Sequence, residues 1–177
     1  MKALIVYGTR GGSTKAIADE IGKTLAAEGF ESTVRNAADL KGIDVKTYDL
    51  AVVGSSVWAT RWSGKATGFL KRNQKTLASK KVALFSSGLA GGDPAQAAYA
   101  KQSIEKTASK FPALKPVALA YFGGLVDFDS PNFIARFMAG AMKADFQKKG
   151  IDTGKPVDTR DWTAIRQWVK DVAAKAG

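Results

Sequence analysis

Short continuous apolar runs alternate with stretches of helical periodicity along this chain, and this alternation most constrains its fold. The runs lie at residues 2–7 (KALIVY), 49–55 (DLAVVGS), 81–86 (KVALFS) and 116–122 (PVALAYF). A continuous apolar run of strand length is typical of a strand buried on both faces. Strands that alternate with helices predict a parallel sheet covered by helices on both sides.

The stretches between the runs carry helix signals. Ile17, Ile21 and Leu25 recur every four residues after the first run, and Gly29 follows as a stop. Residues 32–36 supply one more short strand. Further helices are expected at about residues 63–78, 94–110 and 159–175. At 177 residues and 45% hydrophobic content, the chain is expected to form one domain, residues 1–177, without a linker.

The composition limits the chemistry that the side chains can perform. The sequence contains no Cys and no His. The lack of Cys excludes disulfides, thiolate catalysis and zinc–thiolate sites, and the lack of His removes the commonest general base and metal ligand. We therefore expect no metal site. If the chain is an enzyme, a cofactor is expected to carry the chemistry.

The net charge of +11 favours anionic partners, which include nucleic acid, an anionic membrane face, acidic proteins and carboxylate-bearing substrates. The basic residues are spread along the chain without a recognisable nucleic-acid-binding motif, so no nucleic-acid partner is expected. No apolar run approaches the roughly 20 residues of a membrane span. The first run is also too short for the apolar part of a signal peptide, and a cytoplasmic protein is expected.

The loop after the first apolar run combines small residues with hydroxyl groups. Residues 8–14 read Gly-Thr-Arg-Gly-Gly-Ser-Thr. The glycines let the backbone fold close around a ligand, and the hydroxyl side chains add donors. Backbone N–H groups at the start of the following helix complete an anion pocket that needs no lysine. A plain strand-to-helix turn with a Ser or Thr cap requires fewer such residues.

Three other kinds of α/β loop do not fit this sequence. A P-loop needs Lys before its Ser or Thr, whereas Lys15 follows Ser13 and Thr14. A dinucleotide fingerprint needs a different glycine spacing and an acid at the end of the second strand, where Arg35-Asn36 stands. A phosphoacceptor receiver needs acids at its strand ends, and the strand that ends at residues 52–55 offers none. A monophosphate is the best ligand for the loop.

Residues 9–14 resemble the phosphate loop of flavodoxins, with hydroxyl residues first and last and Gly fourth. Residues 54–58 (GSSVW) resemble the second flavin loop, and residues 86–93 (SSGLAGGD) occupy the place of the third. The resemblance implies a flavodoxin-like, doubly wound, five-stranded parallel sheet of order 2-1-3-4-5, with an extra helical insert before the last helix. It implies FMN as the cofactor, bound by Thr9, Arg10, Gly11, Gly12, Ser13, Thr14, Ser55, Ser56, Val57, Trp58, Ala59, Ser87, Gly88, Leu89, Gly91 and Gly92.

A flavin ring needs a flat apolar wall, which Trp58 or Trp62 can provide by stacking. Flavodoxins commonly close the other face of the ring with an aromatic residue in the third loop. This loop has none, because Tyr99 falls inside the next expected helix. The departure implies a more open flavin.

The segment 123–157 exceeds the minimal alternation of strands and helices. Its apolar residues fall at helical spacing on one face: Phe133, Ile134, Phe137, Met138, Ala141, Met142 and Phe146. Basic residues edge that face: Arg136, Lys143, Lys148 and Lys149. One interpretation is an extra helix that packs on the domain. The other is an apolar face that meets a membrane surface or a bulky ligand.

The charge bears on the kind of flavodoxin-like protein, since flavodoxins that only carry electrons are typically acidic. A second resemblance, to the menaquinone-dependent protoporphyrinogen dehydrogenases, is carried by the Thr-Arg-x-Gly form of the first loop and by residues 53–71. It continues through residues 136–138, 152–153 and 159–162. It implies an oxidoreductase that takes hydrogen from a propionate-bearing tetrapyrrole and passes electrons through FMN to a quinone, with peripheral contact at the inner face of the membrane.

Two alternatives stay open at this point, a flavodoxin electron carrier and an NAD(P)H-dependent FMN or quinone reductase. No catalytic residue is identified. Cationic residues such as Arg61, Arg136 and Lys143 can attract propionates or anionic lipid head groups, or can be ordinary solvated charges. The positive field is expected to favour the anionic reduced flavin and so raise its potential.

Overall fold

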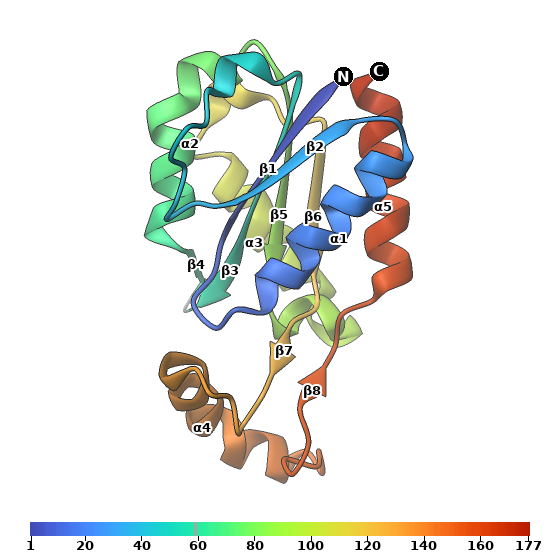
Figure 1. Ribbon diagram of the computed structural model, residues 1–177. Coiled ribbons are helices and arrows are strands. Elements are labelled where there is room, and N and C mark those ends of the chain that lie inside the picture. Colours follow the sequence, from blue (N-terminus) through green and yellow to red (C-terminus); the bar gives the residue numbers. More distant parts are fainter. Residues whose placement is uncertain (59) are drawn as a thin grey trace.

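A parallel sheet forms the centre of the computed structural model, which describes residues 1–58 and 60–177, and the backbone alone at 134 and 138 (Figure 1). Its strands are β1 (Lys2–Gly8), β2 (Glu31–Asn36), β3 (Leu50–Trp58), β5 (Lys81–Ser87) and β6 (Ala118–Phe122). They lie in the order β2-β1-β3-β5-β6. Counted along the chain this is 2-1-3-4-5, so the predicted topology is confirmed. The short strand β4 (Arg61–Trp62), which pairs antiparallel with β3, was not predicted.

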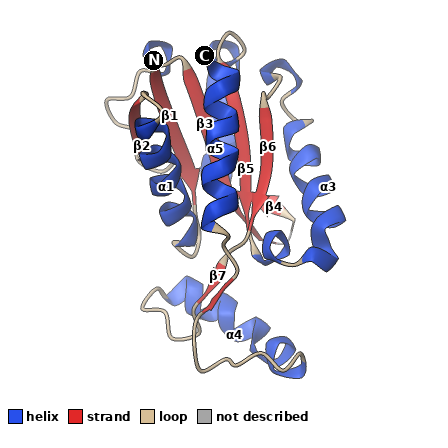
Figure 2. Ribbon diagram, turned by 90° about the vertical axis from the view of Figure 1, so that its right-hand side faces the viewer, coloured by secondary structure: helices blue, strands red, loops and turns tan. Residues whose placement is uncertain are grey.

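Helices cover both faces of the sheet, as expected (Figures 1 and 2). The helices α1 (Ser13–Ala27) and α5 (Trp162–Ala176) lie on one face, and α2 (Gly64–Leu77) and α3 (Ala97–Ala108) on the other. Alternate residues of β1 enter the two cores, so that Ile5 packs on the first pair of helices and Leu4 on the second. Both faces are buried, which explains why the strands are continuous apolar runs.

Short 3₁₀ turns connect several elements: Val45–Thr47, Leu89–Gly92, Pro94–Gln96 and Pro112–Leu114. The turn at Pro94–Gln96 explains why α3 begins later than predicted. Its backbone is fixed by Asp93, whose carboxylate accepts the Ala95 N–H at 3.0 Å. The chain therefore makes one tight turn before the α-helix starts at Ala97.

The expected helical insert is present and stands apart from the sheet. Residues 125–158 form what we call the lobe, which contains β7 (Leu125–Val126), α4 (Phe133–Lys148) and β8 (Val157–Asp158). It extends from the end of the sheet at which the parallel strands terminate (Figures 1 and 2). The remaining residues, 1–124 and 159–177, form what we call the sheet body. No helix in the described part of the chain has the length and apolar character that a bilayer crossing requires.

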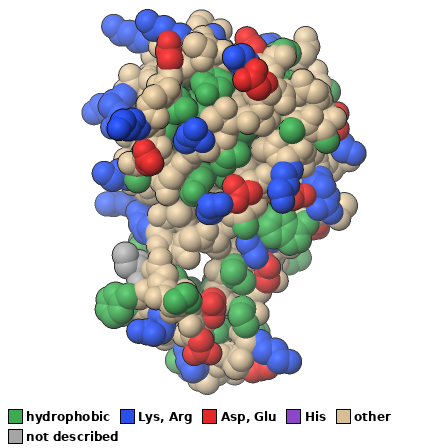
Figure 3. All heavy atoms as spheres, in the orientation of Figure 1, with side chains coloured by type: hydrophobic (Ala, Val, Ile, Leu, Met, Phe, Trp, Pro, Cys, Tyr) green, Lys and Arg blue, Asp and Glu red, His purple; other side chains and the backbone are tan. Residues whose placement is uncertain are grey.

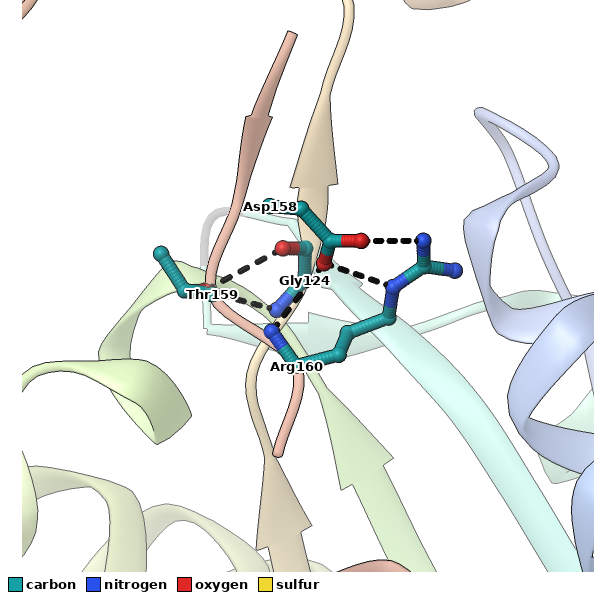
Figure 4. A network of polar contacts seen from close by, with 4 residues as sticks. All are labelled: Gly124, Asp158, Thr159 and Arg160. Carbon is teal, nitrogen blue, oxygen red and sulfur yellow. Dashed lines mark hydrogen bonds and ion pairs between the residues drawn. The ribbon is translucent and has the colours of Figure 1, made fainter. Parts of the chain in front are cut away.

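Hydrogen bonds fix the place where the chain enters and leaves the lobe (Figure 4). The N–H and the hydroxyl of Thr159 donate to the Gly124 carbonyl at 2.9 and 3.1 Å, and the Gly124 N–H donates to Thr159 Oγ1 at 3.0 Å. A Cβ on Gly123 would collide with the Thr159 carbonyl, so glycine is required for this close approach. The two crossing segments are therefore held side by side.

Candidate functional site

A cavity of about 620 Å³ lies between the sheet body and the lobe. Figure 3 shows the molecule hollowed between these two parts. The sheet body contributes the loops that follow β1, β3 and β5, and the lobe contributes small and apolar side chains of α4. These side chains include Ala135, Ala139 and Met142. Ligands of open α/β sheets bind at this position, beyond the carboxyl ends of the strands.

The first loop brings backbone N–H groups to the cavity. Gly12 has a φ of 91°, a left-handed conformation that favours glycine, and the chain turns there into α1. No described side chain caps the first turn of α1, so this turn keeps donors for a ligand. Gly11, Gly12 and Ser13 line the cavity. Thr9 does not line it, and its Oγ1 instead accepts the Gly12 N–H at 2.8 Å.

Arg10 and Thr14 connect the loops to one another instead of lining the cavity. Thr14 is fully buried, and its Oγ1 lies 2.9 Å from Oγ of Ser87 in the third loop. The Arg10 N–H donates to Oγ of Ser56 in the second loop at 3.3 Å. The Arg10 guanidinium donates to two backbone carbonyls of β4 at 3.4 and 3.3 Å. These contacts hold the three loops in a fixed relation.

The second loop supplies Ser56, Val57 and Trp58 to the cavity wall. The Trp58 side chain is 37% exposed, as expected of a ring that is free to contact a ligand. Ser55 is buried, and its Oγ accepts the N–H of the residue that precedes α2 at 2.8 Å, so it supports the loop from below. Ala59 lies outside the described residues.

Trp62, the other tryptophan considered for the ring wall, belongs to the core. It is 5% exposed, and its Nε1 donates to Oγ of Ser86 at 2.8 Å. The indole is thereby withdrawn from the cavity and has its polar atom satisfied. Of these two residues, Trp58 is the one that can stack on a ligand.

The third loop enters the cavity only in its first part, residues 87–90. Gly91 and Gly92 line a neighbouring cavity of about 600 Å³ between α3 and β6. A Cβ on Gly91 would collide with the Phe122 carbonyl, and a Cβ on Gly92 would collide with the Thr159 side chain. The two glycines therefore serve close backbone packing at the edge of the sheet.

Two aromatic residues line the cavity although the third loop contains none. Tyr99 from α3 and Tyr121 from β6 lie in the same wall as Trp58. Burial raises the pKa of Tyr121 to about 12, with a smaller contribution from the neighbouring Tyr99. Sequence reasoning missed both, because neither residue is part of a loop, although the alternation of side chains along β6 could have placed Tyr121 on the α3 side of the sheet.

Asp127 and Arg160 are the charged residues that line the cavity within the described residues. Arg160 Nη2 and Nε lie 2.6 and 2.8 Å from the carboxylate oxygens of Asp158 (Figure 4). The Arg160 guanidinium carbon lies 4.6 Å from the Trp162 ring centre. This hydrogen bonding lowers the pKa of Asp158, although burial opposes it. Asp127 Oδ1 accepts the Asp129 N–H at 3.0 Å. Neither lining residue was predicted, since their approach depends on the placement of the lobe.

The sheet order and the cavity at the strand ends define a flavodoxin-like α/β protein. Residues 4–151 match the family model of the flavodoxin domain, and the chain belongs to this family. It is 25% identical over 175 residues to protoporphyrinogen IX dehydrogenase [quinone] of Escherichia coli (strain K12), with 98% of this chain and 95% of that protein covered.

Solved structures of low sequence identity share the fold. A flavodoxin of Streptococcus pneumoniae TIGR4 has a TM-score of 0.56 and 14% identity, with 99% of each chain covered. A flavoprotein of Lactobacillus acidophilus NCFM, solved in complex with FMN, has a TM-score of 0.52 and 18% identity, with 68% of this chain and 92% of that one covered.

Proposed function

We propose that the cavity binds FMN, with the phosphate on the first loop and the ring system beside Trp58. The cradle formed by Gly11 and Gly12 lacks side chains that would block an anion, and the first turn of α1 offers its N–H groups. The volume of about 620 Å³ falls in the range of roughly 300–1,000 Å³ typical of cofactor sites. Residues 11–13, 56–58 and 87–89 would hold the cofactor.

The colour of the purified protein tests this first step. Bound FMN makes a protein yellow, and FMN added to stripped protein should restore the colour with a stoichiometry of one. A colourless protein that takes up no FMN in equilibrium dialysis would contradict the proposal. The same titration, repeated with riboflavin, measures what the phosphate loop contributes.

We infer further that the chain is an oxidoreductase of the protoporphyrinogen dehydrogenase type, which passes electrons to a quinone. The observation that carries this inference is the lobe, because it adds a second, largely apolar wall opposite the flavin loops. Ala135 and Ala139 contribute only methyl groups to this wall. The named relative and the net charge of +11 support an anionic substrate.

The bound cofactor would supply the redox chemistry, and the chain would supply position and shielding. The apolar side of α4 would shield the space above the flavin loops from water. Trp58 and Tyr99 provide flat faces against which ring systems can pack. This division of labour fits a chain that contains neither Cys nor His.

Anaerobic mixing separates this function from its alternatives. The FMN-loaded protein is mixed with protoporphyrinogen or with NADPH, and the flavin absorbance is followed. Rapid bleaching by protoporphyrinogen, with reoxidation by a quinone, is the expected result. Rapid bleaching by NADPH alone would instead support a reductase, and slow bleaching by both would support an electron carrier, which the basic charge disfavours.

A quinone acceptor resides in a bilayer, and α4 offers a face for contact with one. Phe133 and Phe137, one helical turn apart, are 71% and 69% exposed, and the neighbouring Arg136 and Lys143 are exposed as well. Aromatic side chains beside basic ones are typical of helices that bind an anionic membrane surface. We propose that this face of the lobe contacts the membrane peripherally.

Vesicle sedimentation tests the membrane contact. The wild-type protein is expected to sediment with vesicles that contain about 30% phosphatidylserine and to stay in solution with pure phosphatidylcholine, because the headgroup charge supplies part of the attraction. The double substitution of Phe133→Ser and Phe137→Ser should abolish sedimentation. Equal sedimentation of the wild-type protein and the double variant would contradict the assignment of this face.

A further inference from the structure

We propose that Arg160 anchors a carboxylate of the substrate in the cavity between the lobe and the flavin loops. This inference rests on the proposed function, because it requires that the cavity hold a second ligand beside FMN. It names a feature of that ligand, which is an acidic group at one end of an apolar ring system. It also assigns to one residue a role in substrate choice.

The Arg160 guanidinium is fixed before any ligand arrives. Its side chain is 9% exposed. The Asp158 carboxylate accepts hydrogen bonds from Nε and Nη2 at 2.8 and 2.6 Å. The Trp162 ring lies 4.6 Å from the guanidinium carbon. A planar group held by a two-pronged ion pair and by an aromatic ring loses little freedom when a ligand binds.

The same guanidinium keeps donors for a second carboxylate. Guanidinium carries five N–H donors, and the Asp158 contact uses the Nε edge. Within residues 1–58 and 60–177, no acceptor contacts Nη1 of Arg160. A ligand carboxylate on that side would form charge-assisted hydrogen bonds at a wall largely withdrawn from water, where such bonds are strong.

The position of Arg160 fixes the orientation of the ligand. The preceding residue, Thr159, is hydrogen-bonded to Gly124, and a Cβ on Gly124 would lie 3.2 Å from Cα of Gly88 in the third loop. Arg160 thus lies at the junction of the third loop and the lobe. A ligand held there by its acidic group extends its apolar part along Ala139 and the other α4 residues of the wall.

Asp127 is the remaining charged residue of the described cavity wall, and it does not compete for this role. Its negative charge repels a carboxylate, and its Oδ1 already accepts the Asp129 N–H. The substitution Asp127→Asn therefore should not weaken the binding of a carboxylate. This variant is a control that removes a negative charge, instead of a positive one, from the same cavity.

A binding titration tests the proposal without turnover. FMN-loaded protein is titrated with protoporphyrin IX and, in the same mild detergent, with its dimethyl ester, and porphyrin fluorescence is followed. Arg160→Gln is expected to weaken protoporphyrin binding about 10- to 100-fold, as loss of a charged hydrogen-bond partner does. Its ester affinity should stay within about twofold of the wild-type value, and Arg160→Lys should bind the acid with intermediate affinity.

Arg166→Gln is the matched control. It removes the same charge from α5, where Arg166 pairs with Glu20 at 3.0 Å and does not line the cavity. Both affinities of this variant should stay within about twofold of the wild-type values. If Arg160→Gln does not fold, the double substitution Asp158→Asn with Arg160→Gln removes both charges, and the same comparison of acid and ester applies. FMN affinity and Tm are recorded for every variant.

Several results would overturn the proposal. If Arg160→Gln leaves acid binding unchanged, or lowers acid and ester affinity equally, the role of Arg160 is contradicted while the proposed function stands. A lowered flavin midpoint potential with intact porphyrin binding would move Arg160 to the flavin edge instead. If the wild-type protein does not bind FMN, the proposed function itself is contradicted. If it binds FMN but neither porphyrin, both the proposed substrate and the role of Arg160 are contradicted.

Discussion

The sheet body and the lobe enclose one cavity, but they differ in the size of the apolar cores that stabilise them. The sheet body has a core on each face of the sheet, and many of its side chains, such as Phe69 and Phe85, are almost fully buried. The lobe has a small cluster centred on Val126, Phe128 and Ala139. The flavin loops therefore rest on a rigid base, and the wall opposite them rests on few contacts.

This difference predicts unequal local stability. Segments with few buried apolar contacts open at lower free energy than the core of the same chain. The lobe is expected to exchange its amide protons faster than β1, β3 and β5, while the hydrogen bonds between Gly124 and Thr159 stay formed. For the function proposed above, rigid loops would keep FMN bound, and a more adaptable wall would let the product leave.

The largest expected effect separates a buried aromatic residue of the sheet body from a partly buried one of the lobe. Phe85 is fully buried and packs against Phe122 and Trp168, so Phe85→Ala should lower the free energy of unfolding by about 3–5 kcal/mol. Phe146 of the lobe packs against Phe128, and Phe146→Ala should lower it less while speeding amide exchange within residues 125–158. Urea denaturation and hydrogen exchange measure both. Equal losses would show that the two parts unfold as one.

Substitutions at Trp58 and Trp62 should have opposite consequences for FMN binding and for stability. Trp62→Phe leaves the buried Ser86 hydroxyl without its partner and should cost about 1–3 kcal/mol of stability, with FMN affinity nearly unchanged. Trp58→Ala should raise the Kd for FMN about 10-fold with little change in Tm, because stacking is lost at an exposed site. Trp58→Phe is the control that keeps a ring. Loss of FMN from the Trp62 variant alone would reverse the assignment.

Two Gly→Ala substitutions should change stability in opposite directions. Gly12 has a φ of 91°, so an alanine there costs about 1–2 kcal/mol and should also weaken FMN binding. Gly140 lies in the middle of α4, is exposed to solvent and has open space where a Cβ would be. Gly140→Ala should therefore stabilise the helix by about 0.5–1 kcal/mol. Thermal unfolding measures the first effect and amide exchange of α4 the second. Destabilisation by both would contradict the open space beside Gly140.

The smallest effect concerns pH. Tyr121 has its pKa raised from the usual 10 to about 12 by burial, so folding favours the neutral phenol. Its contribution to stability is full below pH 10 and is lost as the pH rises through about 12. Rapid spectrophotometric titration of the FMN-free protein near 295 nm should show this late ionisation. Tyr121→Phe should remove it, and a wild-type titration without a late step would contradict the burial of this residue.

The sequence was sufficient for the sheet because its information is local. The buried strands can be identified as apolar runs, and the glycines of the first loop indicate the turn into α1. The short strand β4 was missed because two residues carry no periodic signal. The insert was predicted as a helix with one apolar face, but the structure divides its described apolar residues, so that Met142 and Phe146 pack in the lobe while Phe133 and Phe137 are exposed.

The site was predicted less completely, for a physical reason. Loop composition identified residues near the cavity, yet it could not distinguish Trp58 from Trp62, because both are aromatic and lie four positions apart. Arg160 lies next to the cavity through hydrogen bonds between Gly124 and Thr159, which are 35 residues apart in the chain. Contacts of that range follow from tertiary packing, so the resemblance at residues 159–162 gave no role for Arg160.

The pairing of Gly124 with Thr159 has a consequence for how such a protein can be modified. The backbone leaves the sheet body and returns to it at two points joined by a 2.9 Å hydrogen bond, so the intervening 125–158 segment is a loop with nearly coincident ends. A short turn can close that gap without moving β6 or α5. The lobe is in this sense an exchangeable module, and transplanting it between related scaffolds is a direct route to altering what they accept beside the same cofactor.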